Sequence, residues 1–162
     1  MITGFAGCWL TARDHRLLGR TLQKLSAIAS PLAPVLQEKL DRALVVRALD
    51  DDVAALGSHV EYVLAGCLPE RRILVAEGGH GTVGLHLPLA TARAIALIGM
   101  REGQSAEFPE NGAMRQILLR RVLFQAFPAA RPEEKTAEII HLNHFARSRR
   151  LPEPRSKAKE TR

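Results

Sequence analysis

Aromatic residues are scarce in this sequence: Trp, Tyr and Phe make up 4% of its 162 residues, too few to line an aromatic ligand pocket. Cysteine is also scarce. Cys8 and Cys67 are the only two and form no Cys-x-x-Cys pair, which best fits a reduced, cytoplasmic protein. The first ten residues lack both a basic start and a sustained apolar run, so the sequence indicates no signal peptide and no membrane span.

The composition that remains is that of a globular chain, with 46% hydrophobic residues and a mean hydropathy of −0.05. Its length suits one ordinary domain plus an extension. The net charge of +6 is concentrated at the C-terminal end, where residues 127–162 carry nine Lys or Arg against five Glu. We expect this tail to be partly helical, over residues 133–150, and otherwise disordered.

The basic tail has two interpretations. Clustered cations release counterions from phosphates and favour nucleic-acid contact. The interspersed glutamates and a single stacking aromatic, Phe145, favour a tail that only solvates the protein. For nucleic-acid contact the candidate residues are Arg147, Arg149, Arg150, Arg155, Lys157 and Lys159.

Helical periodicity predicts an antiparallel hairpin over residues 11–49, after an N-terminal segment of residues 1–10. Thr11 is placed to cap the first helix, and leucines recur along one face as far as Leu25. The sequence Ser-Pro-Leu-Ala-Pro then breaks the pattern. Two helices joined by such a short break form a hairpin.

The second helix of this hairpin is predicted from Pro34 to about Val46, since a proline is tolerated in the first turn of a helix. Ser30, Pro31 and Leu32 therefore form the hairpin tip. No carboxylate occurs between residues 27 and 34.

From Gly57 onward the hydrophobic period changes from helical to alternating, which predicts a sheet. Asn111 and Gly112 suit the positive φ angles of a tight hairpin, and a short apolar helix over residues 89–98 can cover one side of the sheet. The fold class is therefore α+β, with the helical hairpin followed, in residues 50–126, by a strongly bent, mostly antiparallel sheet of about five strands over one helix. The predicted strands cover residues 59–64, 71–76, 83–88, 105–110 and 114–125.

No set of residues converges on catalysis, so we predict a protein that is not an enzyme and holds no metal or cofactor. The Gly-Gly-His-Gly sequence at residues 78–81 lacks the Lys-Ser/Thr of a phosphate-binding loop, which favours a plain turn. His141 and His144 can share one helix face, but no further ligand follows at metal-binding spacing.

Two other polar features have plain structural interpretations. Asp50, Asp51 and Asp52 are consecutive and therefore splay their carboxylates in different directions, which favours a solvated turn over a cation site. Cys67 lies near two arginines that can lower a thiol pKa, yet an ordinary loop cysteine is favoured.

A series of motifs follows in a fixed order over residues 52–125. They are Gly-Ser-His-Val before a strand, Leu-Pro-Leu-Ala at residues 87–90, a helix ending in Gly-Met-Arg-Glu-Gly-Gln, and Pro-Glu-Asn-Gly. This order resembles the C-terminal domain of the GreA/GreB transcription elongation factors. The short preceding arm is similar to the Rnk type, the regulators of nucleoside diphosphate kinase, whereas Gre factors proper carry a long coiled coil.

The resemblance implies an FKBP-like domain that docks at the rim of the secondary channel of bacterial RNA polymerase, with the hairpin directed toward the channel. We expect a monomer. At the position of the family's Ser-Pro, the docking candidates are Leu87, Pro88, Leu89 and Ala90. Leu87 replaces the serine of the pattern, so the alternative for these residues is that they end a strand and pack in the core. A second departure is Gln104, which replaces an aspartate of the family pattern.

In Gre factors an acidic pair at the hairpin tip helps to hold a catalytic magnesium ion in the polymerase, and hard cations do require such oxygen ligands. The tip here has no carboxylate, and a second helix of about thirteen residues extends only about 20 Å. The sequence thus predicts a factor that modulates elongation or competes with longer Gre factors without stimulating transcript cleavage. One alternative is a general protein-interaction regulator of nucleotide metabolism. A second is an FKBP-type peptidyl-prolyl isomerase, which the scarcity of aromatic residues disfavours.

Overall fold

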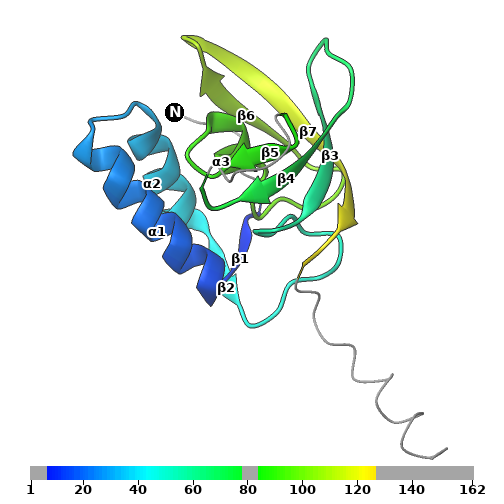
Figure 1. Ribbon diagram of the computed structural model, residues 1–162, viewed down its shortest axis with the longest axis horizontal. Helices are drawn as coiled ribbons and strands as arrows, with labels where there is room; N and C mark the ends of the chain where they lie inside the picture. Colours follow the sequence, from blue (N-terminus) through cyan, green and yellow to red (C-terminus); the bar gives the residue numbers. More distant parts are fainter. Residues whose placement is uncertain (1–6, 78–83, 127–162) are drawn as a thin grey trace, which may run out of the picture. The chain divides into compact units, whose positions relative to one another are not determined.

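The computed structural model describes residues 7–77 and 84–126 of the chain. It begins with a helical hairpin of α1 (Ala12–Ala27) and α2 (Leu32–Arg42) (Figure 1). Thr11 caps α1 as predicted, because its Oγ1 accepts a hydrogen bond from the Asp14 amide at 3.1 Å. The second helix starts two residues before the predicted Pro34, with Pro31 at its N-cap position.

The prediction that the second helix continues to Val46 is wrong. The helix ends at Arg42, and Ala43 adopts an extended conformation. Strand β2 (Leu44–Val46) then pairs in parallel with β1 (Trp9–Thr11). The Leu44 amide donates to the Cys8 carbonyl at 2.8 Å. This Leu-Val-Val stretch is β-prone, and a neighbouring strand supplies the hydrogen bonds that another helical turn would have made. The predicted plain N-terminal segment therefore also contributes a strand.

A five-stranded sheet of mixed direction follows the hairpin, in the order β5-β4-β3-β7-β6. Only the β4–β5 pair is parallel, which confirms the α+β class and the mostly antiparallel sheet. The two residues of the predicted Asn-Gly turn between the last strands have φ angles of 53° and 77°, as a tight hairpin requires. The strands are β3 (His59–Leu64), β4 (Glu70–Val75), β5 (His86–Pro88), β6 (Ser105–Glu110) and β7 (Ala113–Phe124).

The predicted short helix is present but shorter than expected. It covers α3 (Ala92–Leu97) instead of residues 89–98, because Thr91 adopts an extended conformation and caps it, accepting from the Ala94 amide at 3.4 Å. Strand β5 ends at Pro88, as predicted for the strand before this helix. The predicted Gly-Gly-His-Gly turn at residues 78–81 and the whole tail from residue 127 lie outside the described residues.

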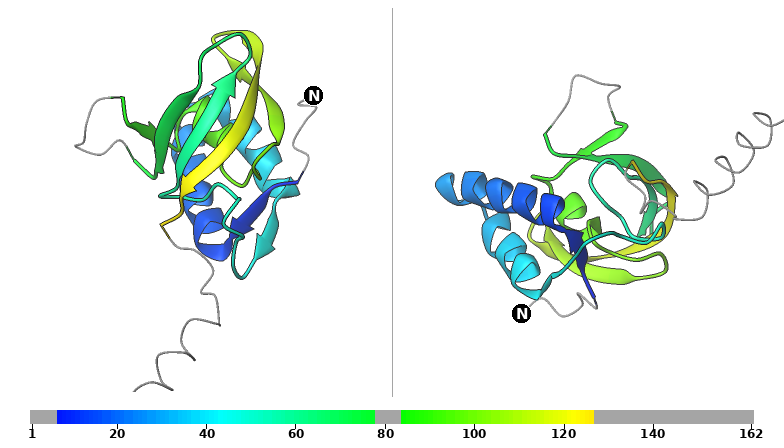
Figure 2. Two further views of the ribbon diagram at one scale, coloured as in Figure 1. Left: turned by 90° about the vertical axis from the view of Figure 1, so that its right-hand side faces the viewer. Right: turned by 90° about the horizontal axis from the view of Figure 1, so that it is seen from below.

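The hairpin and the sheet share one hydrophobic core. Figure 2 shows α3 between the hairpin and the sheet. Leu18 of α1, Leu36 of α2, Ile95 of α3 and Ile117 of β7 belong to one cluster, and none of the four side chains is exposed. This cluster continues across the predicted border between residues 49 and 50. None of the described helices is long and apolar enough to cross a membrane.

Candidate functional site

Two buried ionisable side chains fix the hairpin to the rest of the protein. Lys39 of α2 is 0% exposed, and its Nζ donates to the backbone carbonyl of Ala96 at 2.8 Å. Ala96 lies in the last turn of α3, where unpaired carbonyls carry partial negative charge that a cation stabilises. Burial lowers the pKa of the Lys39 ammonium to about 8, and the nearby Cys8 thiol opposes this shift.

Asp14 makes the corresponding contact from α1. Its side chain is 4% exposed, and Oδ2 accepts from the Leu56 amide at 3.3 Å. Burial raises the pKa of this carboxyl, while the Leu56 hydrogen bond lowers it in part. Each helix of the hairpin is therefore joined to backbone outside the hairpin by one buried polar group, which sets the direction in which the tip points.

The hairpin tip is apolar and exposed. Ile28 is 74% exposed, and Ala29 has a φ angle of 50°, in the left-handed region that suits a sharp turn. Of the three predicted tip residues, Pro31 is exposed and Ser30 and Leu32 are half-buried. The Ser30 hydroxyl accepts from the Leu32 amide at 3.3 Å, which stabilises the start of α2.

The hairpin packs into the core nearly to its tip, because Leu25, two residues before the end of α1, is buried and belongs to the shared cluster. Near the end of α1, Lys24 forms an ion pair with Glu77, two residues after β4. At 1.5 Å per residue, the 16 residues of α1 and the 11 residues of α2 extend about 24 Å and about 16 Å. Since Leu25 is in the core and α1 ends at Ala27, only the short loop to α2 continues beyond the packed part of the hairpin.

The predicted docking residues divide between core and surface. Leu87 is 8% and Leu89 0% exposed, so both side chains belong to the hydrophobic core. Pro88 is half-buried and Ala90 is exposed. The Thr91 hydroxyl donates to the Pro88 carbonyl at 2.7 Å, which fixes the turn between β5 and α3. A partner that docks at this turn would therefore contact mainly Pro88 and Ala90.

Beside this turn lies an ion-pair network that the sequence did not reveal. Arg93 of α3 makes a two-fold contact with Glu110, at 2.7 Å from Nε and 3.3 Å from Nη2. It also lies 3.4 Å from Glu70, which accepts from the buried Tyr62 hydroxyl at 3.1 Å and from Arg72 at 2.9 Å. The contact with Glu110 raises the pKa of Arg93, which keeps its charge fixed. The cross-strand pair of Tyr62 and Glu70 follows from strand register, but the arrival of Arg93 depends on where α3 packs.

The acidic turn and the position of Gln104 have structural partners. Arg101 binds Asp50 at 2.9 Å and Asp52 at 3.0 Å, and its guanidinium lies 5.1 Å above the centre of the Trp9 ring. The Gln104 side chain accepts from the Arg101 amide at 2.8 Å, so the residue that replaces the family aspartate caps this turn. Within residues 7–77 and 84–126, no group of three or more His, Cys, Asp or Glu side chains could hold a metal ion. Cys67 is an exposed free thiol.

A two-helix hairpin joined through one core to a curled sheet with a short covering helix defines a class of fold. It is the fold of the GreA/GreB transcription elongation factors. A GreA/GreB factor from Nitrosomonas europaea superposes with a TM-score of 0.57 and 23% identity over 72% of this chain and 99% of its own. This likeness confirms the predicted resemblance at the level of the fold.

Two further solved structures match with lower TM-scores. Gfh1 of Thermus thermophilus covers 70% of this chain and 97% of its own, at 20% identity and a TM-score of 0.35. Gfh1 of Thermus aquaticus covers 70% and 96%, at 21% identity and a TM-score of 0.37. No protein-family model and no curated protein matches the sequence.

Proposed function

We propose that this protein binds bacterial RNA polymerase as a Gre-type factor with a short arm. The observation that carries the proposal is the likeness to the Nitrosomonas europaea transcription elongation factor, which extends over 99% of that chain and so includes both the hairpin and the sheet. A shared arrangement of arm and sheet favours a shared mode of use more than a common sheet alone would, although a fold by itself does not give a function.

The chemistry of the tip supports a factor that occupies the channel without stimulating transcript cleavage. A tip that held magnesium would need carboxylate oxygens. Residues 27–34 have none, and the tip presents Ile28 and Pro31 instead. The burial of Leu25 near the end of α1 also leaves only a short loop free to project. Such an arm competes for space with longer factors but brings no metal ligands.

The binding test uses the full chain and purified bacterial RNA polymerase core. We expect the protein to bind core and to be displaced by an excess of a GreA factor, as two ligands of one site are. Replacing Ala90 with Asp, which places a charge on the exposed turn before α3, should weaken binding, whereas Asp51→Asn on the exposed loop before β3 should not. Wild-type protein that fails to bind core contradicts the proposal.

The activity test uses backtracked elongation complexes. The wild-type protein should leave the transcript intact and should reduce cleavage stimulated by a GreA factor. Restored cleavage by the wild-type protein would show that carboxylates at the tip are not required and would refute the proposed mode of action. The variant Ala29→Asp with Ser30→Asp supplies two carboxylates at the tip; if it also fails to stimulate cleavage, reach as well as chemistry is limiting.

The packing on the inner side of the sheet favours this proposal over a prolyl isomerase. Isomerase activity needs an open, apolar pocket for a proline ring. Here Tyr62 and Phe108 are both 0% exposed and fill the space under α3, and Arg93 and Glu110 border it with an ion pair. A protease-coupled assay on a prolyl peptide should accordingly give the uncatalysed rate.

A further inference from the structure

The outer face of the sheet carries apolar side chains that nothing in the described chain covers. Successive residues of a strand point to opposite faces. On β7, Ile117 and Leu119 are buried on the inner face, so Leu118 between them points outward and is 37% exposed. Val63 of β3 is its cross-strand neighbour, and Met114, further along β7, is 53% exposed.

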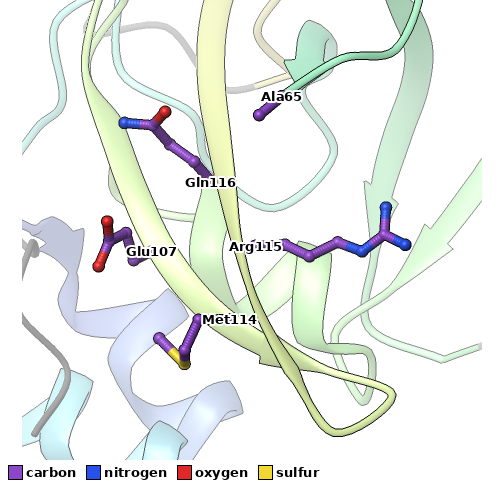
Figure 3. A pocket seen from close by; sticks show the side chains of 5 residues that line it. All are labelled: Ala65, Glu107, Met114, Arg115 and Gln116. Atoms are coloured by element: carbon purple, nitrogen blue, oxygen red, sulfur yellow. The ribbon is translucent and has the colours of Figure 1, made fainter.

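These side chains border a shallow groove across three strands. One part, of about 310 Å³, is lined by Ala65, Glu107, Met114, Arg115 and Gln116 (Figure 3). A second part, of about 320 Å³, is lined by Val63, Ser105 and Leu118 and shares Ala65 and Gln116 with the first. The outer face of an antiparallel sheet is normally polar, so the aliphatic side chains of Val63, Leu118 and Met114 beside the polar lining need a reason.

The charged side chain on the groove side of the strands is that of Glu107. Arg115 points away from the groove in Figure 3 and lies 3.6 Å from Glu110, and Arg120 lies 3.3 Å from Glu61. Glu107, in contrast, is exposed at the groove and forms no ion pair with any residue in the described ranges. A carboxylate beside aliphatic side chains attracts a cation and repels phosphate.

We infer that this groove docks a protein segment that presents an aliphatic side chain next to a lysine or arginine, and that the segment belongs to RNA polymerase. The inference rests on the proposed function and adds a third contact, separate from the hairpin tip and from the turn at Pro88. The aliphatic side chain lies between Val63, Leu118 and Met114, and the cation pairs with Glu107. The open, shallow shape suits a protein surface, whereas a small ligand would stay mostly in water.

Binding of RNA polymerase core to immobilised variants tests the inference. Leu118→Glu places a charge in the apolar part and should weaken binding about tenfold, the size expected when one apolar anchor is lost. Glu107→Gln should weaken it about threefold at low salt, and this difference should shrink at high salt because the ion pair is at the rim. Leu44→Glu is the control, because it makes the same substitution at another exposed strand leucine: Leu44 is 56% exposed against 37% for Leu118, but lies on β2 instead of the groove. Thermal unfolding of each variant checks that the fold is retained.

The outcomes separate the two proposals. Wild-type binding that is weakened by both groove variants and not by the control supports the inference. Wild-type binding that the groove variants leave unchanged overturns the inference alone, and absent wild-type binding overturns the proposed function with it. Tighter binding by Glu107→Lys would indicate an anionic partner, and a dimer that Leu118→Glu dissociates, measured by light scattering, would indicate a second copy of the chain; either result overturns the inference.

Discussion

The Lys39 ammonium lies 2.8 Å from the Ala96 carbonyl and is fully buried between the hairpin and α3. No basic residue occurs in the last turn of α3 itself, so a residue of another helix supplies the cation there. The desolvation of this charge costs stability, which the lowered pKa reflects.

Stability should therefore rise with pH as Lys39 loses its proton. The folded pKa is about 8 and the unfolded value about 10.4, so between these values the unfolded chain binds more protons and the free energy of unfolding increases with pH. Relative to that of Lys39→Met, the free energy of unfolding of the protein with Lys39 should increase by up to about 3 kcal/mol between pH 7 and about pH 10. Urea unfolding at several pH values measures this gain.

Burial raises the pKa of the Cys8 thiol, and Cys8 interacts with Lys39, so both proteins in this comparison should carry Cys8→Ala. Titrations elsewhere in the chain then cancel between the two. A parallel pH dependence in both proteins would show that Lys39 does not lose its proton in this range.

Asp14 should matter as a hydrogen-bond acceptor more than as a charge. Asp14→Leu leaves the buried Leu56 amide without its partner and should lower the free energy of unfolding by about 1–3 kcal/mol. Asp14→Asn keeps an accepting oxygen and should cost less than about 1 kcal/mol at neutral pH, because the raised pKa shows that burial penalises the charged form. Equal losses in the two variants, by urea unfolding, would contradict this assignment.

Gly99 should be far less tolerant of substitution than Gly103. Both have positive φ angles, 78° and 81°, so alanine costs about 1 kcal/mol at either position. A Cβ at Gly99 would also lie 2.6 Å from the Cys8 sulfur and 3.0 Å from the Trp9 carbonyl, whereas at Gly103 nothing lies within 4 Å. We expect Gly99→Ala to cost about 2–4 kcal/mol in all. Adding Cys8→Ala should restore part of that loss, and thermal unfolding of the three variants checks it.

The Arg93–Glu110 pair should show measurable coupling, unlike most surface ion pairs. Its side chains are 29% and 15% exposed and meet through two hydrogen bonds, which places them between the surface and the buried case. A double-mutant cycle with Arg93→Ala and Glu110→Ala should give a coupling free energy of about 1 kcal/mol. The same cycle on the exposed pair of Arg42 and Glu38 is the control and should give less than about 0.5 kcal/mol.

The sequence determined the features that depend on neighbouring residues. Alternating hydrophobicity located the strands, the spacing of leucines located α1, and Thr11 and the Asn-Gly pair marked a helix start and a tight turn. These signals are local, because period and φ angle are properties of a few consecutive residues. Together with the order of the motifs, they were enough to predict the fold class and the likeness to GreA/GreB factors that the structures confirm.

Only the tertiary structure decided the features that depend on distant partners. Residues 44–46 form a strand because Trp9–Thr11 lies beside them, a pairing over more than thirty residues that no local period encodes. The sequence does not distinguish Lys39 from the other polar residues of its amphipathic helix, because its burial depends on the packing of α3. Leu87 and Leu89 could be assigned to the core only once the inner side of the sheet was known. The environment of a charge or an aliphatic side chain is set by what packs on it, and packing is a property of the whole fold.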